Sequence, residues 1–396
     1  MRRRLSFLHP ALTTATVGAL AVGCSGPTSL GNDPEPQGSE QCAVLPPDQA
    51  LPADRTTFGV NPDWAVETLE EFATVTGVEP GAAVQFIGLP FSSEDAQNVR
   101  AAADQVAALG GVLVLTLEPY EGLDAVTDES VQELTDLLSE VNGKQVPVLL
   151  RFAHEMNGSW YPWGQQPQAF IETFRTVAAA VHEQTPATQM MWAPNYGGGY
   201  PFAGGQYAPE AGTADFDALD TDQDGELTEA DDPYQPYYPG DDAVDWVGMT
   251  LYHWGSVYPW GGNNLPETEK FAAQLRGTYD GLGGDESGLP DFYAIYSEER
   301  DKPLAIPETA AFVTEEANSD YALEIRRAWW QQVFSETTRS EFPNIRLINW
   351  FNWDKHEPEA EGIVRWSITS DQRIADAFRS DLPDWVTTAE DVTICQ

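Results

Sequence analysis

The sequence predicts an α/β protein whose parallel strands close into a (β/α)8 TIM barrel. Between residues 55 and 355, short β-rich runs alternate with helix-like segments, which is the pattern of a parallel sheet wrapped by helices. About eight such runs are present, the number that this barrel needs. No Gly-rich phosphate loop follows the first run, and this argues against the alternative architecture, a doubly wound open sheet.

The elements of the barrel can be placed along the chain. Strands are expected at residues 56–60, 83–88, 112–117, 146–152, 189–192, 246–251, 304–306 and 345–350. Helices are expected at residues 64–74, 93–108, 130–140, 167–183, 267–279 and 320–335, where apolar residues recur every three or four positions. A barrel takes about 250 residues plus insertions, so we expect a single catalytic domain over residues 51–396, with an acidic insertion between strands five and six.

The N-terminal segment is expected to be a signal peptide over residues 1–23, excluded from the fold. Three arginines at positions 2–4 precede an apolar stretch, residues 11–23, that is too short for a stable membrane span. The stretch ends in residues 20–24 (LAVGC), which resemble a bacterial lipobox with Cys24 as the lipidated residue. The sequence therefore predicts export, as a cell-surface lipoprotein or as a secreted protein, with a tether over residues 24–50.

The three cysteines are expected to have two different roles. If Cys24 carries lipid, Cys42 and Cys395 remain at the two edges of the folded part, in a compartment that permits disulfides. Barrel closure places the first strand beside the last helix, so we expect a bridge between these two, which requires Cα atoms within about 7 Å. Two free thiols are the alternative.

The charge balance excludes several classes of partner. The chain carries 20 basic and 63 acidic residues, a net charge of −43. This argues against nucleic acid and against an anionic membrane surface, so the membrane is expected to be reached only through a lipid on Cys24. A neutral polymer fits this charge, and a monomer is expected.

Polar and aromatic residues follow the expected strands, where barrel enzymes place their chemistry. They include Glu118 and Tyr120, His154 and Glu155, Asn195, Tyr252 and His253, Glu308, Trp353 and His356. The stretch 151–164 (RFAHEMNGSWYPWG) is the most informative, because it delivers a histidine and a carboxylate from a buried strand into a loop lined with aromatic residues. Aromatic rings stack on sugars, and a carboxylic acid beside them can protonate a glycosidic oxygen.

This stretch, read with residues 238–248 (YPGDDAVDWVG) and 302–309 (KPLAIPET), resembles glycoside hydrolase family 26 over about residues 55–370. The resemblance implies a (β/α)8 barrel and a retaining mechanism, with an acid/base glutamate after the fourth strand and a nucleophilic glutamate after the seventh. Glu155 and Glu308 match those positions. The family includes β-mannanases, β-1,3-xylanases and mixed-linkage β-glucanases, and endo-acting cleavage of a β-linked polysaccharide, β-1,4-mannan first, is the expected function.

A non-cleaving surface glycan-binding protein with the same barrel is the alternative from another class. Its hallmark is the loss of a catalytic carboxylate, whereas this sequence keeps both Glu155 and Glu308.

Retention needs the two carboxyl groups about 5 to 5.5 Å apart. We expect Trp160 and Trp163 to raise the pKa of Glu155 by desolvating it, and Tyr252 and Arg151 to keep Glu308 ionised.

Substrate contacts are expected from His154, Asn157, Trp160, Trp163, Tyr252 and Trp353, with Trp254, Trp260 and Trp350 as further candidates for sugar platforms. A role for His154 as a hydrogen-bonded residue of the barrel wall stays open. A metalloprotease is excluded because His154-Glu155 lacks the second histidine of H-E-x-x-H. A zinc site of His154, His253 and His356 is a further alternative.

The insertion over residues 215–236 carries a calcium-loop pattern. Asp220, Asp222, Asp224 and Asp231 stand at positions one, three, five and twelve, and Gly225 stands at position six. The backbone carbonyl of Glu226 is a further expected ligand. Position twelve is Asp in place of the usual Glu, and Pro233 and Pro236 argue against an exiting helix, so a lone dockerin-like loop with structural Ca²⁺ is expected and a solvated acidic loop is the alternative. No cofactor is expected for catalysis.

Overall fold

The computed structural model describes residues 42–255, 262–282 and 284–396. The predicted signal peptide with Cys24, most of the predicted tether, and Trp260 lie outside these residues. The described part forms one compact unit, Cys42–Gln396. Within these residues no helix has the length and apolar character needed to cross a membrane.

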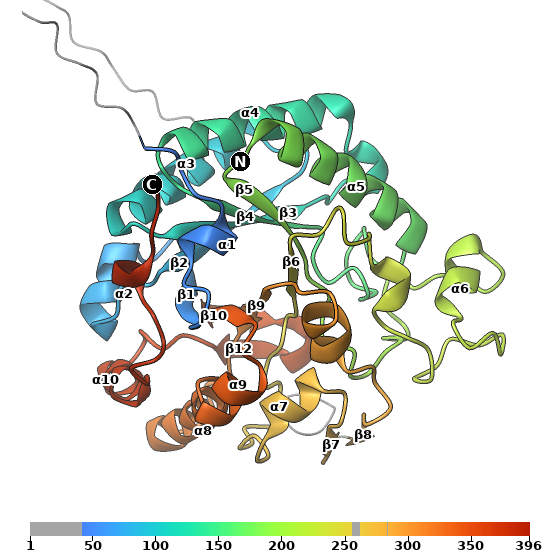
Figure 1. Ribbon diagram of the computed structural model, residues 1–396. Coiled ribbons are helices and arrows are strands. Elements are labelled where there is room, and N and C mark those ends of the chain that lie inside the picture. The colour runs from blue at the N-terminus through green and yellow to red at the C-terminus, as the bar shows by residue number, and fades with distance from the viewer. Residues whose placement is uncertain (1–41, 256–261, 283) are drawn as a thin grey trace, which may run out of the picture. The chain divides into compact units, whose positions relative to one another are not determined.

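Eight parallel strands close into a barrel in the order β1-β10-β9-β6-β5-β4-β3-β2 (Figure 1). They are β1 (Thr57–Pro62), β2 (Ala82–Gly88), β3 (Val112–Glu118), β4 (Val148–Phe152), β5 (Thr188–Trp192), β6 (Trp246–Gly248), β9 (Leu304–Thr309) and β10 (Ile345–Asn352). Each corresponds to one strand expected from the sequence. The predicted (β/α)8 barrel is therefore confirmed.

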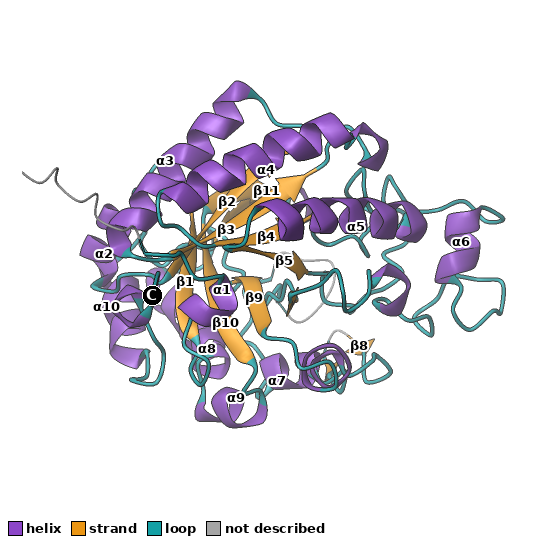
Figure 2. Ribbon diagram, turned by 45° about the horizontal axis from the view of Figure 1, so that its top comes forward, coloured by secondary structure: helices purple, strands orange, loops and turns teal. Residues whose placement is uncertain are grey.

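Helices surround the barrel (Figure 2). They are α1 (Pro47–Ala50), α2 (Leu69–Thr76), α3 (Ser93–Leu109), α4 (Asp128–Gly143), α5 (Pro167–Gln184), α6 (Ala214–Leu219), α7 (Lys270–Leu275), α8 (Ser319–Val333), α9 (Glu336–Glu341) and α10 (Gln372–Asp381). The six helices expected from the sequence correspond to α2, α3, α4, α5, α7 and α8. The helices α1, α6, α9 and α10 were not expected, and the first three have no more than six residues each.

Two helix boundaries differ from expectation for local reasons. The helix α2 begins at Leu69, five residues later than expected, because Thr68 and Glu71 form a capping box that satisfies the free amides of the first turn. The helix α7 is shorter at both ends, since Glu269 before it and Gly277 after it adopt left-handed backbone angles, with φ of 61° and 63°.

Two small hairpins were not expected. The strands β7 (Asp280–Gly281) and β8 (Gly284–Asp285) form one antiparallel pair, and β11 (Asp354–Glu357) and β12 (Gly362–Arg365) form the other. All four are short, and Asp and Gly at these positions are poor strand formers. The second hairpin directly follows β10 and therefore lies at the carboxyl end of the barrel.

The inside of the barrel changes character along its axis. Near the starts of the strands the inner side chains are apolar, among them Val114, Leu149 and Leu347. Two residues further along their strands stand Thr116, Arg151 and Asn349, which are fully buried and polar. A polar layer therefore lies between the apolar core and the carboxyl ends of the strands.

The segment 42–52 closes the amino-terminal end of the barrel. Leu45, Ala50 and Leu51 pack against the apolar inner residues of the strands, and α1 lies across the barrel in Figure 1. Arg346 donates hydrogen bonds to the backbone oxygen of Asp48 at 2.7 Å and to that of Leu51. The end of the predicted tether, residues 42–50, is thus part of the folded domain, because its apolar residues fill this opening.

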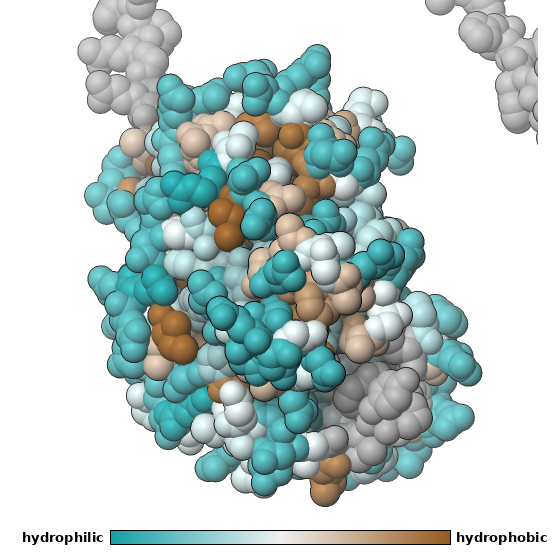
Figure 3. Space-filling view, turned by 90° about the vertical axis from the view of Figure 1, so that its right-hand side faces the viewer, coloured by the Kyte–Doolittle hydropathy of each residue, from teal (hydrophilic) through white to brown (hydrophobic). Residues whose placement is uncertain are grey.

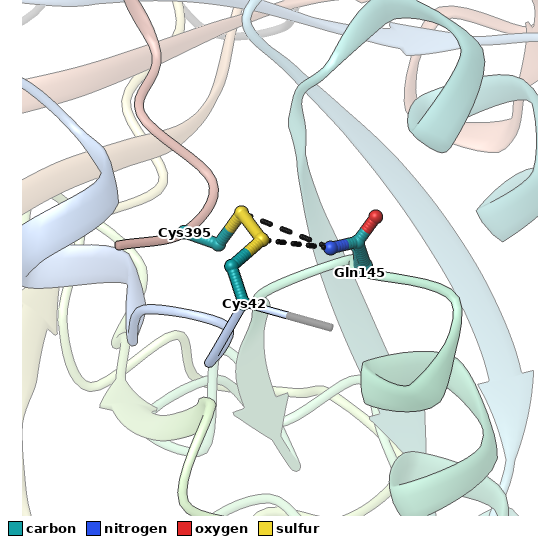
Figure 4. Close-up of a disulfide and its surroundings, with 3 residues drawn as sticks. All are labelled: Cys42, Gln145 and Cys395. Carbon is teal, nitrogen blue, oxygen red and sulfur yellow. Dashed lines mark hydrogen bonds between the residues drawn. A yellow bond between two sulfur atoms is a disulfide. The ribbon is translucent and has the colours of Figure 1, made fainter. Parts of the chain in front are cut away.

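A disulfide joins Cys42 to Cys395, as predicted, with Cα atoms 5.6 Å apart across 353 residues of sequence (Figure 4). The two chain ends run side by side here, since the amide of Leu45 donates to the carbonyl of Ile394 at 2.8 Å. Gln145, between α4 and β4, donates from Nε2 to the sulfur of Cys42 at 3.1 Å. The bridge therefore fastens both ends of the domain beneath the barrel.

The surface agrees with the acidic composition. On the face drawn in Figure 3, hydrophilic residues predominate and hydrophobic residues form small separate patches. Large hydrophobic side chains that stay exposed include Val66, Tyr120, Trp160 and Leu282. Two of these, Tyr120 and Trp160, follow strands β3 and β4 and belong to the region described next.

Candidate active site

Glu155 and Glu308 lie at the carboxyl ends of their strands. Glu155 follows β4, and its amide donates to the carbonyl of Ala193, after β5, at 3.0 Å. Glu308 is the second-last residue of β9. The backbone at Ala153 and Glu155 has φ of 46° and 54°, a left-handed conformation that is costly for residues with a side chain. Such local strain concentrates at functional sites, and here it turns the chain sharply after the strand.

Glu308 is buried and paired with a cation. Arg151 is fully buried and its Nη1 contacts Oε1 of Glu308, and the hydroxyl of Tyr252 donates to Oε2 of Glu308 at 2.7 Å. Both contacts were predicted and are confirmed. A cation therefore contacts one oxygen of this carboxylate, and a hydrogen-bond donor contacts the other.

Glu155 has a different environment. Burial raises the pKa of Glu155 to about 7, and the negative charge of Glu308 adds to this rise, whereas Arg151 opposes it. The indole Nε1 of Trp160 donates to Oε2 of Glu155 at 3.0 Å. This hydrogen bond lowers the pKa, so the contact has the opposite sign to the desolvation that we expected from Trp160.

The two carboxyl groups therefore have different surroundings. Near neutral pH, Glu155 retains its proton in a substantial fraction of molecules, while Glu308 forms an ion pair with Arg151. A carboxyl group that keeps its proton beside a carboxylate in an ion pair can act as the proton donor, with the carboxylate as the nucleophile.

His154 is 2% exposed and lies among aromatic rings, with centroids at 5.0 Å from Tyr161 and 5.7 Å from Trp163. Burial, with a contribution from Arg151, lowers its pKa well below the usual value, so the imidazole is neutral. Its Nδ1 is buried without a protein partner among the described residues. A hydrogen bond from Nδ1 to the barrel wall, the alternative left open above, is therefore not observed.

Asn157 and Trp163 are fully buried, which favours positioning roles over the substrate contacts that we expected. The side chain of Asn157 donates to the carbonyl of Asn195 at 2.8 Å and accepts from its amide at 2.9 Å, so it joins the loops after β4 and β5. The Nε1 of Trp163 donates to the carbonyl of His154 at 2.7 Å. Trp160, in contrast, is 38% exposed and keeps surface for a ligand.

The opposite side of the site is also aromatic. Tyr252 lies near Trp366 and Phe351, with ring centroids 5.1 Å and 5.8 Å away. Trp353 is partly exposed just past β10, whereas Trp350 is fully buried and packs within the barrel. Trp353 and the partly exposed Trp254 therefore stay candidates for sugar platforms, and Trp350 does not.

Two residues of the site had no role in the sequence analysis. Thr250 is buried and its hydroxyl accepts a hydrogen bond from Nη2 of Arg151, so it helps to orient the guanidinium. Strand alternation from Tyr252 is the signal that would have placed Thr250 on the same face. Glu118, which ends β3, was noted as a strand-end residue without a function, yet its carboxyl lies close enough to Glu308, Arg151 and Glu155 for their charges to act on it.

The acidic insertion groups three of its five expected calcium ligands. Ligand atoms of Asp220, Asp222 and Asp224 lie within 4.8 Å of one another, directly after α6. Asp231 is 2% exposed, and its carboxylate accepts from the backbone amides of Thr221 at 2.6 Å and Thr228 at 2.9 Å. The carboxylate expected at position twelve is therefore already hydrogen-bonded to backbone amides. After it, the chain forms the short 3₁₀ turn Gln235–Tyr237, whereas an EF-hand has a helix at this place.

The alternative zinc site of three histidines does not form. His253 is fully buried and its Nε2 contacts the carbonyl of Asn264 at 2.8 Å, while His356 is exposed on β11. Among the described residues, the aspartate group above is the one set of three metal-binding side chains brought together.

Comparison with known proteins points to one family. Residues 111–208 match the model of glycosyl hydrolase family 26. Endoglucanase H of Acetivibrio thermocellus is 23% identical over 319 residues, which are 78% of this chain and 28% of that protein. These matches support an assignment to glycoside hydrolase family 26. The match to the family model includes β3, β4, β5 and Glu155, whereas Glu308 lies beyond it.

Solved structures of family 26 proteins share the fold. A β-mannanase from Bacteroides ovatus superposes with a TM-score of 0.52 and 17% identity, over 85% of this chain and 91% of that one. A modular endo-β-1,4-mannanase from Cellulomonas fimi gives a TM-score of 0.52 and 14% identity, over 89% and 79%. The chain spans about 28% of the length of Endoglucanase H, so the activity of that whole protein is not transferred to this chain.

Proposed function

We propose that the chain is a retaining, endo-acting glycoside hydrolase that cleaves a β-linked polysaccharide, with β-1,4-mannan as the first candidate. The observation that carries the proposal is the pair of glutamates with opposite environments. Glu155 is partly buried and its pKa is raised to about 7, and Glu308 is paired with Arg151 and Tyr252. A retaining glycosidase needs one proton donor and one nucleophile of this kind.

The reaction follows from these two states. The carboxylate of Glu308 attacks the anomeric carbon while Glu155 gives its proton to the departing glycosidic oxygen, so a glycosyl ester forms as the glycosidic bond breaks. Glu155, now a carboxylate, then removes a proton from water, and this water attacks the anomeric carbon and releases Glu308. Both carboxyl groups return to their starting states, and the product keeps the β configuration.

Two observations bear on the substrate. The related structures from Bacteroides ovatus and Cellulomonas fimi are described as mannanases, which supports mannan. Endoglucanase H favours a second candidate, a β-glucan such as mixed-linkage glucan, because it matches 78% of the chain. Trp160, which is exposed after β4, and Trp353, which is partly exposed after β10, support binding along a polymer and hence internal attack.

Reducing-sugar release from purified β-1,4-mannan, mixed-linkage β-glucan and β-1,3-xylan tests the activity and the substrate together. We expect release from mannan and a rapid fall in viscosity, which marks internal cleavage. Cleavage of the glucan alone would replace mannan as the substrate. Binding of a polysaccharide in affinity electrophoresis without any release would leave the non-cleaving glycan-binding alternative.

Proton NMR of the first products tests the stereochemistry. We expect the β-anomer to appear before mutarotation. An α-anomer at early times would mean inversion, for which the carboxyl groups stand about 6.5 to 9.5 Å apart, and would overturn the retaining mechanism.

We also propose that the insertion binds a structural Ca²⁺ through Asp220, Asp222 and Asp224, with the carbonyl of Glu226 as a further ligand. The grouping of three carboxylates supports this, because they repel one another without a cation. A chelator is expected to lower the Tm of the wild type and to leave that of Asp222→Asn unchanged. Equal melting of both proteins in calcium and in chelator would refute the site.

We further propose that the protein is exported as a monomer and that Cys24 carries the lipid of a bacterial lipoprotein. The basic and apolar pattern of residues 1–23 and the LAVGC sequence support this. In a bacterial host, an alkynyl fatty acid should label the wild type and fail to label Cys24→Ala. Equal labelling of both proteins would contradict the lipid.

A further inference from the structure

Glu118 is a third carboxylate of the site that the proposed reaction does not use. It ends β3, and alternation from Val112 and Val114, which face the barrel interior, directs its side chain to the same inner side. The neighbouring residue Leu117 is in register with Phe152, the last residue of the strand that leads to Glu155. Glu118 therefore stands beside the acid-bearing strand, at the carboxyl end of the barrel.

Burial of this carboxyl group disfavours its charged form. It is 8% exposed, and burial raises its pKa to about 7, with further rises from the charges of Glu308 and Glu155. Its side-chain hydrogen bond among the described residues comes from the hydroxyl of Tyr120. A carboxylate has acceptor sites for about four hydrogen bonds, so most of its capacity is left for another group.

Tyr120, two residues further along, is 56% exposed although its hydroxyl is bonded to Glu118. Its ring meets that of Trp163 in a T-shaped contact with centroids 5.6 Å apart, and Trp163 is itself fixed by its bond to His154. An exposed tyrosine ring is thus held in place at both its edge and its hydroxyl.

A fixed aromatic ring beside a carboxylate with free acceptor sites is how proteins bind a pyranose unit. The ring packs against the apolar C–H face of the sugar, and the carboxylate accepts hydrogen bonds from two hydroxyl groups. The alternative, a purely structural role, is not supported by the burial of Tyr120, because most of its side chain contacts solvent.

We propose that Glu118 and Tyr120 form a sugar-binding position on the β3 side of the site, which holds a pyranose unit next to the bond that is cleaved. The inference rests on the proposed function and adds to it, because it names the residues that bind the chain of a neutral polysaccharide beside Glu155. The expected ligand is an uncharged hexose unit, since a third carboxylate in a chain of net charge −43 repels acidic sugars.

The test measures kinetics and binding on the polysaccharide that the wild type binds best. Tyr120→Ala and Glu118→Gln are each expected to raise KM about 10-fold while kcat changes less than about 3-fold, because a ring contact or a hydrogen bond to a charged group is lost. Tyr120→Phe keeps the ring and should recover most of the loss. Tyr321→Ala, on the outer helix α8, is the control and should match the wild type. Affinity electrophoresis should rank the variants in the same order without depending on turnover.

Each outcome has a separate meaning. If the wild type cleaves the polysaccharide and both variants keep its KM and its retardation in the gel, the sugar-binding position is wrong and the proposed function stands. If kcat and Tm fall while KM is unchanged, the two residues are structural and the inference is again wrong. If the wild type neither binds nor cleaves any neutral polysaccharide of the panel, both proposals fall. If the wild type binds the polysaccharide without cleaving it and the variants bind it more weakly, the sugar-binding position is supported and the proposed hydrolase activity is wrong.

Discussion

The two ends of the barrel differ in the chemistry of their side chains. At the amino-terminal end, Leu45 and Leu51 fill the opening, Arg346 binds backbone carbonyls, and the Cys42–Cys395 bridge joins the chain ends. At the carboxyl end, the carboxyl groups of Glu118, Glu155 and Glu308 lie near the buried Arg151. One end is closed by apolar packing and a covalent bridge, whereas the other gathers ionisable side chains.

This difference separates stability from function. Buried polar atoms without a protein partner include both side-chain ends of Asn61 and of Asn349 and the Nδ1 of His154, all in the barrel wall or near its carboxyl end. Such groups are costly unless water or a ligand binds them. A change at the amino-terminal end should therefore alter the free energy of unfolding and leave kcat/KM nearly unchanged. A change at the carboxyl end should lower kcat/KM and affect the free energy of unfolding less.

The largest expected effect is that of Glu308→Ala, which removes the nucleophile. Turnover of every substrate should fall on the order of 10⁴-fold or more, because no glycosyl ester can form. Steady-state kinetics measure this, with Glu308→Gln as a second variant that keeps the shape of the residue between Arg151 and Tyr252. Glu140→Gln, on the surface of α4, is the control. Wild-type activity of Glu308→Ala would overturn the assignment.

Glu155→Ala should behave differently, because it removes the acid and spares the nucleophile. Activity on polysaccharide is expected to fall about 10² to 10⁴-fold, while aryl glycosides with good leaving groups remain substrates and azide restores the second step. In the wild type, activity should decline as the pH rises through about 7, since the proton of Glu155 is lost there. A variant that shows no azide effect and the same high-pH limb as the wild type would contradict this role.

Removal of the disulfide tests the amino-terminal end of the barrel. Replacing Cys42 and Cys395 together by Ser should lower the free energy of unfolding by about 4 kcal/mol, since the bridge restrains a very long loop in the unfolded chain. The kcat/KM at 25 °C should stay within about 2-fold of the wild type. Chemical denaturation with and without reductant provides the measurement, and reductant should shift the wild type alone. A large loss of kcat/KM in the folded variant would break the separation between the two ends.

The smallest expected effect concerns the stability cost of the raised pKa of Glu155. The folded state holds this proton up to about pH 7, whereas the usual carboxyl value is 4.5, so the residue costs stability as pH rises from about 4.5 to 7 and at all higher pH. Glu155→Gln should therefore gain about 1 kcal/mol over the wild type at pH 8 and little at pH 4, after a discount for partial exposure. Thermal melts at both pH values measure it, and an equal gain at both would contradict the charge argument.

Most of the barrel could be predicted from the sequence, because strand and helix periodicities are local. The strand starting near Val112 and the helix starting at Ser93 were placed within one residue. The β11–β12 hairpin was missed because its first strand consists of charged and polar residues. The helix α10 was missed although Ile374, Ala375 and Phe378 form an apolar face with helical spacing, so it could have been predicted. The start of α2 could have been found from the capping box of Thr68 and Glu71, a pattern visible in the sequence.

The candidate site could be predicted in part. The pairing of Glu308 with Arg151 and Tyr252 follows from strand alternation, so it was accessible. Burial of Asn157 and Trp163 was not, because a tryptophan in a loop has the same sequence signature whether its ring faces a ligand or its indole N–H reaches a backbone carbonyl. The role of Glu118 depends on the charges around it, which appear only when three strands are brought together.

The location of Cys42 has a geometric consequence. The chain enters the domain at this residue, at the amino-terminal end of the barrel, while Glu155 and Glu308 stand at the carboxyl end. If the proposed lipid on Cys24 attaches the protein to a membrane, the attachment is therefore made through the end of the barrel opposite the two glutamates, and no part of the site has to be released for a polysaccharide to bind.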